Sequence, residues 1–496
     1  MSIKLPVSVA TERLPPDPGG TADFMSRIGY SLEEALSDII DNSIDAHATV
    51  VLVRFVRGKN RVRQIIIADN GDGMLPNELH NAMQYGVRQS HEKHDLGKYG
   101  IGLKAAAFSQ CRSLSVMSRK SDEVAGRRWT AESIKNDWRL ERLDASQVQR
   151  VLSVDWRPAE ITISGTIVVL DQLDSLQSSF SDFEKMLQKT ILGLKNGFGL
   201  RFHRFLEREK LKIVIDATGA IDGVSATKIP VEPLDPFGYG KSGKAGYPVT
   251  FALDIGGQVV DADAHIWPPK SKDANYKLGN GKVAERQGFY FYRNDRLIKA
   301  GGWHQFQGDA EPHLSLARVL IEMPPSLDSQ FRLTVQKNDF NVPPEFVDAV
   351  RASRAGNTTF NDYLKAAQDT YRNAPQAQEI VYYVGKGVPA QLSRKMERLI
   401  VATENVVARA IDFEWGVLDE GEVFDFDADK QAIVLNSTYR RRITGGRNSA
   451  ADAPAFKTLL LNAIGDLLDA GRVTVKLRRR IERVNSMLLE AVKYQS

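Results

Sequence analysis

The chain has 496 residues, of which 42% are hydrophobic and 26% are charged, so it is expected to form two or three soluble globular domains. Its formal net charge of +4 is too small over this length to indicate nucleic-acid binding from bulk charge. One cysteine, Cys111, excludes a disulfide framework within one chain, and the lack of a signal-peptide core or a long apolar run favours a cytoplasmic protein without membrane contact.

The N-terminal third predicts alternating helices and strands. Residues 1–20 are rich in proline and are expected to form an extended arm. Residues 30–46 carry apolar side chains at helical spacing, which predicts an amphipathic helix. Two β-branched runs, 50–55 and 63–68, flank a polar tip and predict a hairpin, and a helix is expected at 78–85.

Further strands are expected at 114–118, 127–131, 161–163 and 166–170. Helices laid on one face of a mainly antiparallel sheet would form an α+β layer domain. We assign this first domain to residues 21–195.

The second domain is predicted over residues 196–345. Strands are expected within it at 212–215, 249–255, 288–293 and 318–322.

The third domain is predicted over residues 346–496, as a mixed α/β and largely helical extension. Its expected elements are helices at 345–372 and 388–411, a hairpin at 423–436, and final helices at 455–470 and 473–494.

The first predicted helix carries the motif SDIIDNSIDA. Asp38 and Asn42 are four residues apart, so both project from one face of the helix. An asparagine carbonyl is a hard oxygen ligand suited to magnesium, and a carboxylate one turn earlier could orient or deprotonate a water molecule.

The second motif, ADNGDGM, ends at Met74. Asp69 follows an apolar strand, and its carboxylate could accept a hydrogen bond from an exocyclic amino group. Gly71 and Gly73 would permit a tight turn and a close approach of the backbone to a flat base.

The third motif, GKYGIGLK, contains three glycines followed by a helix-forming segment. Such a segment can present backbone N–H groups and a helix N-terminus to phosphate oxygens. Its residues are Gly97, Lys98, Tyr99, Gly100, Ile101, Gly102, Leu103 and Lys104. Together with the other two motifs it predicts an ATP site.

In this order and spacing, the three motifs resemble those of the Bergerat-fold ATPases, also called GHKL after gyrase, heat-shock chaperone, histidine kinase and MutL. The resemblance covers about residues 21–175. The segment GKYGIGLKAAA is most similar to the glycine loop of the microrchidia (MORC) proteins and their bacterial relatives.

This resemblance implies a role for each motif. Asn42 would hold Mg²⁺, and Asp69 would bind the adenine amino group of ATP, with Gly71, Gly73 and Met74 shaping the base site. The glycine motif would form a lid over the phosphates. Thr166, in SGTIVVLD, matches a threonine at the floor of the site.

The resemblance also implies that the second domain is a transducer-like (S5-like) α/β domain. The segment RLTVQKNDF is similar to the loop that brings a lysine to the γ-phosphate, which nominates Lys337 as a catalytic residue. The preceding segment FYRNDRLIKAGGW, residues 291–303, is similar to a MORC-like strand pair.

The chain departs from the family pattern at the general base. The family has a glutamate four residues before the asparagine, whereas this chain has Asp38. Because the aspartate is one methylene shorter and small misplacements slow catalysis strongly, we expect slow hydrolysis.

The expected function is that of a MORC-like ATPase that binds Mg-ATP, closes its lid and forms a homodimer, which drives a conformational switch. By resemblance, the switch would serve a DNA-linked process such as antiphage defence or restriction, with DNA or a nuclease or helicase as partner. Basic residues cluster in the last third and could contact phosphates; they are Arg440, Arg441, Arg442, Arg447, Arg472, Lys476, Arg478, Arg479, Arg480 and Arg483.

Other functions are compatible with the same motifs. A histidine or protein kinase would transfer phosphate from this site, but it predicts a dimerising helix with a phosphoacceptor upstream of the ATP domain. A chaperone is disfavoured by the short C-terminal region. A nucleotide-binding scaffold with little hydrolysis remains open because of Asp38.

Overall fold

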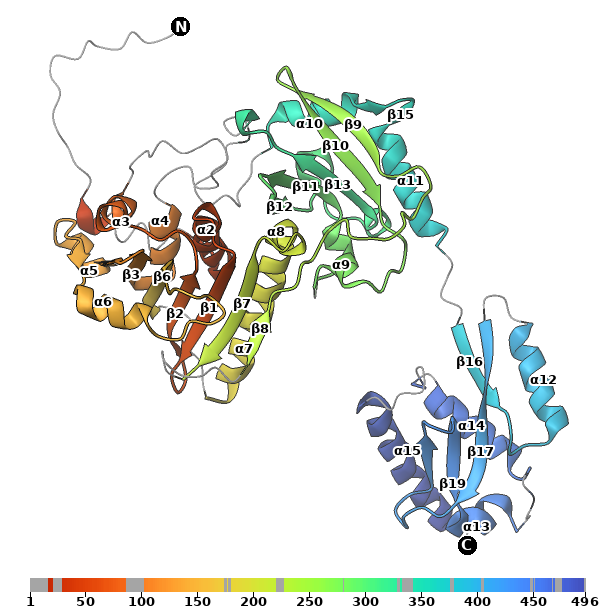
Figure 1. Ribbon diagram of the computed structural model, residues 1–496. Coiled ribbons are helices and arrows are strands. Elements are labelled where there is room, and N and C mark those ends of the chain that lie inside the picture. The colour runs from red at the N-terminus through yellow and green to blue at the C-terminus, as the bar shows by residue number, and fades with distance from the viewer. Residues whose placement is uncertain are drawn as a thin grey trace. The chain divides into compact units, whose positions relative to one another are not determined.

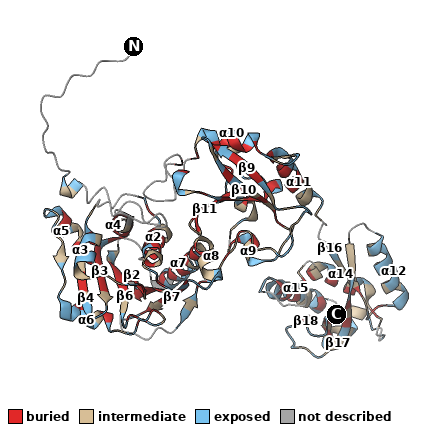
Figure 2. Ribbon diagram, turned by 45° about the horizontal axis from the view of Figure 1, so that its top comes forward, coloured by how far each residue is buried: buried red, intermediate tan, exposed pale blue. Residues whose placement is uncertain are grey.

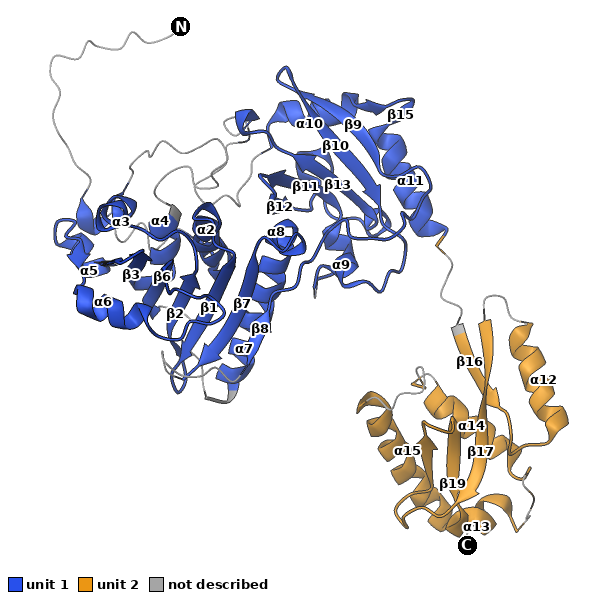
Figure 3. Ribbon diagram, viewed as in Figure 1, with its two compact units in different colours: residues 1–373 blue, residues 374–496 orange. Residues whose placement is uncertain are grey.

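In the computed structural model the chain divides into two compact units, residues 1–373 and 374–496 (Figure 3). The structure describes residues 17–20, 29–85, 102–173, 176, 180–219, 227–279, 281–327, 331, 342–374, 379–402, 406–446, 449, 451–465, 467–468 and 475–494. No helix in this described part of the chain is long and apolar enough to cross a bilayer.

The first unit contains a sheet with the strand order β5-β4-β3-β6-β2-β1-β7-β8 (Figure 1). The strands are β1 Val50–Arg57, β2 Val62–Asp69, β3 Cys111–Lys120, β4 Glu123–Thr130, β5 Glu141–Arg142, β6 Ser164–Leu173, β7 Lys212–Thr218 and β8 Lys228–Pro230. The pairing is antiparallel apart from β1 and β7, which run parallel. The predicted hairpin is confirmed, with Val51 opposite Asp69.

Helices cover both faces of this sheet. Along β1, Val51, Val53 and Phe55 point into one core, whereas Leu52 and Val56 point into the other, as the two-residue period of a strand requires. The first core is covered by α2 Leu32–Asp45, α3 Pro76–Met83, α4 Gly102–Phe108, α5 Ala131–Lys135 and α7 Phe180–Arg201 (Figures 1 and 2). The second core is covered by α6 Ala145–Leu152, so the expectation of helices on one face is incomplete.

The first sheet extends further along the chain than predicted. The strand expected at 212–215 is β7, and it pairs with β1 instead of belonging to the second region. Arg54 on β1 and Asp216 opposite it on β7 form a buried ion pair, 2.9 Å between Nη2 and Oδ2, which joins the two strands. The strand predicted at 161–163 is wrong, because Ile161 packs in the second core from a turn and Ile163 is exposed.

A second sheet in the first unit has the order β12-β11-β13-β10-β9. Its strands are β9 Val249–Ile255, β10 Gln258–Ile266, β11 Gly288–Arg293, β12 Arg296–Ala300 and β13 Ala317–Glu322. The helices α10 Pro344–Ala352 and α11 Phe360–Arg372 pack on this sheet through Phe346, Phe360 and Tyr363. They therefore belong to the second core and not to the C-terminal domain predicted to begin at 346.

The first unit also contains short elements between its longer helices and strands. They are α8 His203–Glu207, α9 Ala274–Lys277, β14 Arg354–Ala355, β15 Thr358–Thr359 and the 3-10 turns η1 Val283–Arg286, η2 His304–Phe306, η3 Pro312–Leu314 and η4 Pro325–Leu327.

The second unit is a mixed α/β fold with the strand order β16-β17-β19-β18. Its elements are β16 Glu379–Val384, α12 Ala390–Val401, β17 Val406–Gly416, β18 Phe424–Asp427, β19 Ala432–Asn436, η5 Ser437–Tyr439, α13 Arg440–Thr444, α14 Pro454–Gly465 and α15 Val475–Tyr494. The predicted hairpin and the last helix are confirmed, whereas the helix predicted at 455–470 ends at Gly465. The helix predicted at 388–411 is wrong beyond Val401, because the β-branched and aromatic residues from Val406 onward form β17.

Candidate functional site

Helix α2 carries the first motif, and its start is defined by local hydrogen bonds. The Ser31 hydroxyl accepts from the Glu34 amide at 3.3 Å, and the Glu34 carboxylate accepts from the Ser31 amide at 2.9 Å, which forms a capping box. On this helix Asp38 and Asp41 are buried, whereas Asn42 is exposed. The Asn42 amide nitrogen donates to the Asp38 carbonyl at 2.9 Å, so the side-chain oxygen of Asn42 is the atom that could bind a cation.

Asp69, the last residue of β2, joins the second motif to α2. Its carboxylate accepts from the Ser43 hydroxyl at 3.0 Å and from the Gly71 amide at 2.9 Å, and it also accepts from the Thr166 backbone amide. Burial raises the pKa of Asp69 to about 6, although these hydrogen bonds oppose the shift. Since Ser43 follows Asn42 directly, the bond to Asp69 holds the first two motifs together.

The turn after Asp69 is fastened to the loop between α2 and β1. The Asn70 side-chain oxygen accepts from the amides of Thr49 and Val50 at 3.0 and 2.8 Å. Gly73 has φ of +69°, and a Cβ there would lie 1.8 Å from the Arg119 carbonyl oxygen. A Cβ on Gly71 would lie 2.7 Å from the Ala46 carbonyl oxygen. The protein's own backbone therefore requires both glycines, before any ligand is considered.

Thr166 lies opposite Asp69 in the β2–β6 register, as an element of the same site. Its hydroxyl shares a 2.9 Å hydrogen bond with the Ser118 hydroxyl, and Ser118 accepts from the Met74 amide at 2.8 Å. Ser118 was not predicted as a site residue. Its position on β3, directly across from Thr166 on β6, could have identified it.

The third motif is described in part. Gly97, Lys98, Tyr99, Gly100 and Ile101 lie outside the described residues, and Gly102 begins α4. The α4 residues Ala105 and Ala106 share a buried cluster with Tyr30 and with Ala35 of α2, so the helix that follows the glycines packs beside the helix that carries Asn42.

Two residues at the start of α4 contact the first domain's core. Leu103 is half-buried against the first core. The buried Lys104 ammonium donates to the Gln84 carbonyl at 2.8 Å and lies 5.6 Å from the centre of the Tyr85 ring. Burial lowers the pKa of Lys104 to about 8. The Lys104 ammonium thus contacts Gln84 and Tyr85, the two residues that directly follow α3.

The second sheet contributes an arginine to the two buried carboxylates of α2. Arg296, the first residue of β12, places Nη1 2.7 Å from Asp41 Oδ2 and Nη2 3.5 Å from Asp38 Oδ1. Arg296 is 1% exposed and the two aspartates are 5% or less, so this contact is fully buried. Burial raises the pKa of the Tyr30 hydroxyl, and its hydrogen bond to the charged Asp38 raises it further.

Arg296 is the main residue that the sequence did not identify. It lies within the segment 291–303 that resembles a MORC-like strand pair, directly before the apolar residues Leu297 and Ile298. The predicted catalytic Lys337 lies outside the described residues.

Taken together, the described residues place a hard oxygen ligand, a buried hydrogen-bond acceptor and a carboxylate compensated by arginine around one end of α2. Asp38, Asn42, Asp69 and Thr166 come from three elements of the first sheet's layer, and Arg296 comes from the second sheet. Such a set can bind a flat base and a cation and can activate water.

Part of the chain is similar to known proteins. Residues 30–159 match the family model described as histidine kinase-, DNA gyrase B-, and HSP90-like ATPase. The chain is 28% identical over 95 residues to the ATPase MORC2B of Mus musculus, a stretch that covers 18% of this chain and 9% of that protein. A crystal structure described as the N-terminal domain of a DNA repair protein aligns with 71% of this chain and 98% of its own, at a TM-score of 0.41 and 16% identity. Residues 30–159 thus form a GHKL ATPase domain, of the histidine kinase-, DNA gyrase B- and HSP90-like type.

Proposed function

We propose that this chain is a MORC-like ATPase in which Mg-ATP occupies the end of α2 and hydrolysis is linked to the second sheet. The observation that carries the proposal is the Ser43–Asp69 hydrogen bond beside Asn42, within the residues that match the ATPase family. It brings the proposed base-binding carboxylate and the proposed metal ligand to one place.

In this proposal Asp69 accepts a hydrogen bond from the adenine amino group. Thr166, Ser118 and Met74, which are joined by hydrogen bonds, line the same end of the site. Gly71 and Gly73 hold the turn close to Ala46 and Arg119, which keeps the Asp69 carboxylate in place. The eight residues of the third motif, including Gly97, would cover the phosphates.

The Asn42 side chain fits a magnesium site because it offers an exposed hard oxygen next to the carboxylates of α2. When bound, Mg²⁺ would neutralise charge on the phosphates of ATP. The chain's own contribution is to present that oxygen from a helix that packs against α4 and is tied to β2.

Asp38 is the proposed general base, held by Arg296 and by the Tyr30 hydroxyl. A buried carboxylate without a compensating charge takes up a proton and cannot act as a base, so Arg296 is expected to maintain the base. Since Arg296 belongs to β12, nucleotide turnover would depend on the position of the second sheet. We further propose slow turnover, because Asp38 is short, and a contact from Lys337 to the γ-phosphate.

ATP-dependent homodimerisation and a DNA-linked role, including antiviral defence, are proposed from the MORC resemblance. Arg440 of the basic region is committed to the buried Asp452, 3.0 Å away. Lys476, Arg478, Arg479, Arg480 and Arg483 are exposed on α15 and could meet phosphates of DNA or a nuclease or helicase complex that holds DNA.

A nucleotide-binding scaffold is the second candidate, and the Asp38–Arg296 contact favours it. An aspartate held by an arginine in a buried position has less freedom to approach a water molecule than an exposed one. A scaffold would bind Mg-ATP and release no phosphate.

Phosphate release by the purified chain with Mg-ATP tests the proposal. Wild type is expected to release phosphate slowly, and Asn42→Ala is expected to abolish both metal-dependent binding and turnover. Asn81→Ala, at another exposed helical asparagine, serves as the matched control. Binding without release would support the scaffold, and labelled phosphate on the protein would support a kinase.

A further inference from the structure

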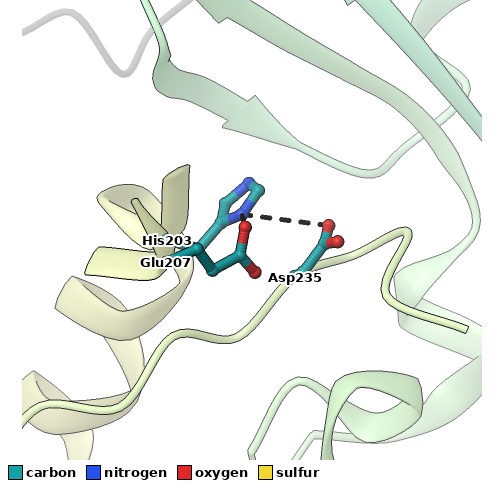
Figure 4. Close-up of side chains that lie close together, drawn as sticks. All are labelled: His203, Glu207 and Asp235. Atoms are coloured by element: carbon teal, nitrogen blue, oxygen red, sulfur yellow. Dashed lines mark ion pairs between the residues drawn. The ribbon is translucent and has the colours of Figure 1, made fainter. Parts of the chain in front are cut away.

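Outside the proposed ATP site, three potential metal ligands converge beside the second sheet (Figure 4). His203 and Glu207 lie one turn apart on α8, and Asp235 lies in the segment between β8 and β9. His203 Nδ1 is 3.5 Å from Glu207 Oε2 and 3.8 Å from Asp235 Oδ1. One ligand atom of each residue lies within 4.8 Å of the other two.

The imidazole of His203 is oriented by its second nitrogen. Nε2 shares a 2.9 Å hydrogen bond with the hydroxyl of the buried Tyr292. His203 is 2% exposed, and its Nδ1 has no hydrogen-bond partner among the residues that the structure describes. A buried imidazole nitrogen that faces two carboxylates carries either a proton or a metal ion on the side toward them.

The distances distinguish these two cations. At 3.5 and 3.8 Å the nitrogen–oxygen separations are too long for good hydrogen bonds. Two ligand atoms that each lie about 2.1 Å from a tetrahedral zinc ion are about 3.4 Å apart. The spacing therefore fits a metal better than it fits a shared proton.

The surrounding charges are compatible with a bound cation. The guanidinium carbon of Arg204 on α8 lies 3.9 Å from the centre of the Tyr292 ring, and Arg204 pairs with Asp295 and Glu322. Its charge is thus largely compensated by other carboxylates.

Access and second-sphere contacts also suit a metal. The Glu207 side chain is 39% exposed, so an ion could enter and keep a water ligand. Asp235 Oδ1 accepts from the Phe237 amide at 2.8 Å, and Tyr292 bonds to the distal nitrogen of His203. Contacts of this kind fix the orientation of metal ligands.

We propose that His203, Glu207 and Asp235 bind a divalent first-row transition metal, with zinc as the best fit to one imidazole and two carboxylates. The ion would hold α8 to the segment that leads into β9, and so would link the first sheet's layer to the second sheet. Its role is structural, and the proposal is independent of the ATPase activity.

The test uses the full chain, stripped of metal, without nucleotide and with excess Mg²⁺ to occupy weaker oxygen sites. Co²⁺ titration followed by visible absorption, and Zn²⁺ competition against a chromophoric chelator, are expected to show one site per chain. Glu207→Gln and Asp235→Asn are expected to lower the affinity at least about tenfold, and Glu232→Gln, an exposed acidic residue of the same segment, is the matched control.

Thermal unfolding keeps the test valid if a variant folds poorly. Zinc is expected to raise the unfolding temperature of wild type and of Glu232→Gln but not of the two ligand variants, each compared with its own metal-free state. A titration without a saturable site in wild type, or equal affinity in wild type and Glu207→Gln, would overturn the proposal and assign the cation to a proton on His203.

Discussion

The two ends of the proposed ATP site hold their buried carboxylates differently. Asp69 is surrounded by neutral donors from α2, its own turn and β6, and burial raises its pKa to about 6. Asp38 and Asp41 instead face the charged guanidinium of Arg296 from β12. Recognition of the base is therefore proposed to be local to the first domain, whereas hydrolysis depends on the second sheet.

The largest effect on the rate of hydrolysis is expected from a change at Asp38. Asp38→Asn removes the proposed base and is expected to lower the rate of phosphate release by about 10²–10⁴-fold, with ATP affinity changed far less. Single-turnover rates and equilibrium binding measure the two quantities. The comparison variant is Asp41→Asn, and an equal loss of rate in both variants would argue against Asp38 as the base.

Arg296→Gln tests whether the second sheet stabilises the buried carboxylates of α2. It leaves two buried carboxylates without their cation, so the free energy of unfolding is expected to fall by about 3–5 kcal/mol. Denaturant unfolding measures this change. Arg54→Gln, in the buried Arg54–Asp216 pair, is the matched control and is expected to lose a similar amount.

An unchanged unfolding free energy in Arg296→Gln, alongside a large loss in Arg54→Gln, would show that the second sheet does not hold α2. Of the two proposals, the one for base recognition by Asp69 within the first domain would then remain, and the one for dependence of hydrolysis on the second sheet would not.

Gly73→Ala tests how tightly the turn after Asp69 is constrained. A Cβ there would lie 1.8 Å from the Arg119 carbonyl oxygen, so the backbone must shift, and a loss of about 2 kcal/mol or more in unfolding free energy is expected together with weaker ATP binding. Gly257→Ala has a similar positive φ but open space, and is expected to cost about 1 kcal/mol. Equal effects of the two variants would contradict the close approach.

The smallest effect concerns the pH dependence of binding. Since burial raises the pKa of Asp69 to about 6, the carboxyl takes up a proton as the pH falls through that value, and ATP affinity is expected to fall by up to about tenfold per pH unit below it. Asp69→Asn is expected to bind ATP weakly and without this pH dependence. Calorimetric titration between pH 5 and 8 measures both.

The raised pKa of Asp69 also predicts that Asp69→Asn stabilises the folded chain at neutral pH. The native state binds a proton more readily than the unfolded chain, so the ionised Asp69 costs stability as the pH rises from 3.8 through about 6. Asp69→Asn is therefore expected to be more stable than wild type at pH 7.5, by up to about 3 kcal/mol. A less stable variant would show that the hydrogen bonds outweigh the cost of burial.

The short motifs led to part of the proposed site. Asp38, Asn42 and Asp69 could be nominated because each lies within a motif, and Thr166 was nominated from the family resemblance. Arg296 and Ser118 could not be found in this way, because their partners lie on other strands and their roles depend on register.

For the fold, too, local contacts could be predicted from the sequence and distant ones could not. The hairpin of β1 and β2 is local, and its two β-branched runs around a polar tip predicted it correctly. The pairing of β1 with β7 joins residues 50–56 to 212–218, and no local pattern reports such a distant parallel contact. The helix at 388–411 was predicted too long. Apolar residues before and after 403–405 have a spacing compatible with a helix, but the β-branched run that begins after 405 favours a strand.

The most direct test of the central claim is a parallel measurement of the ATP dissociation constant and the single-turnover rate in Arg296→Gln, at a temperature where the variant is folded. We predict a dissociation constant within a few-fold of wild type and a rate lower by on the order of a hundredfold. A folded variant that hydrolyses ATP at the wild-type rate would contradict the dependence of hydrolysis on the second sheet.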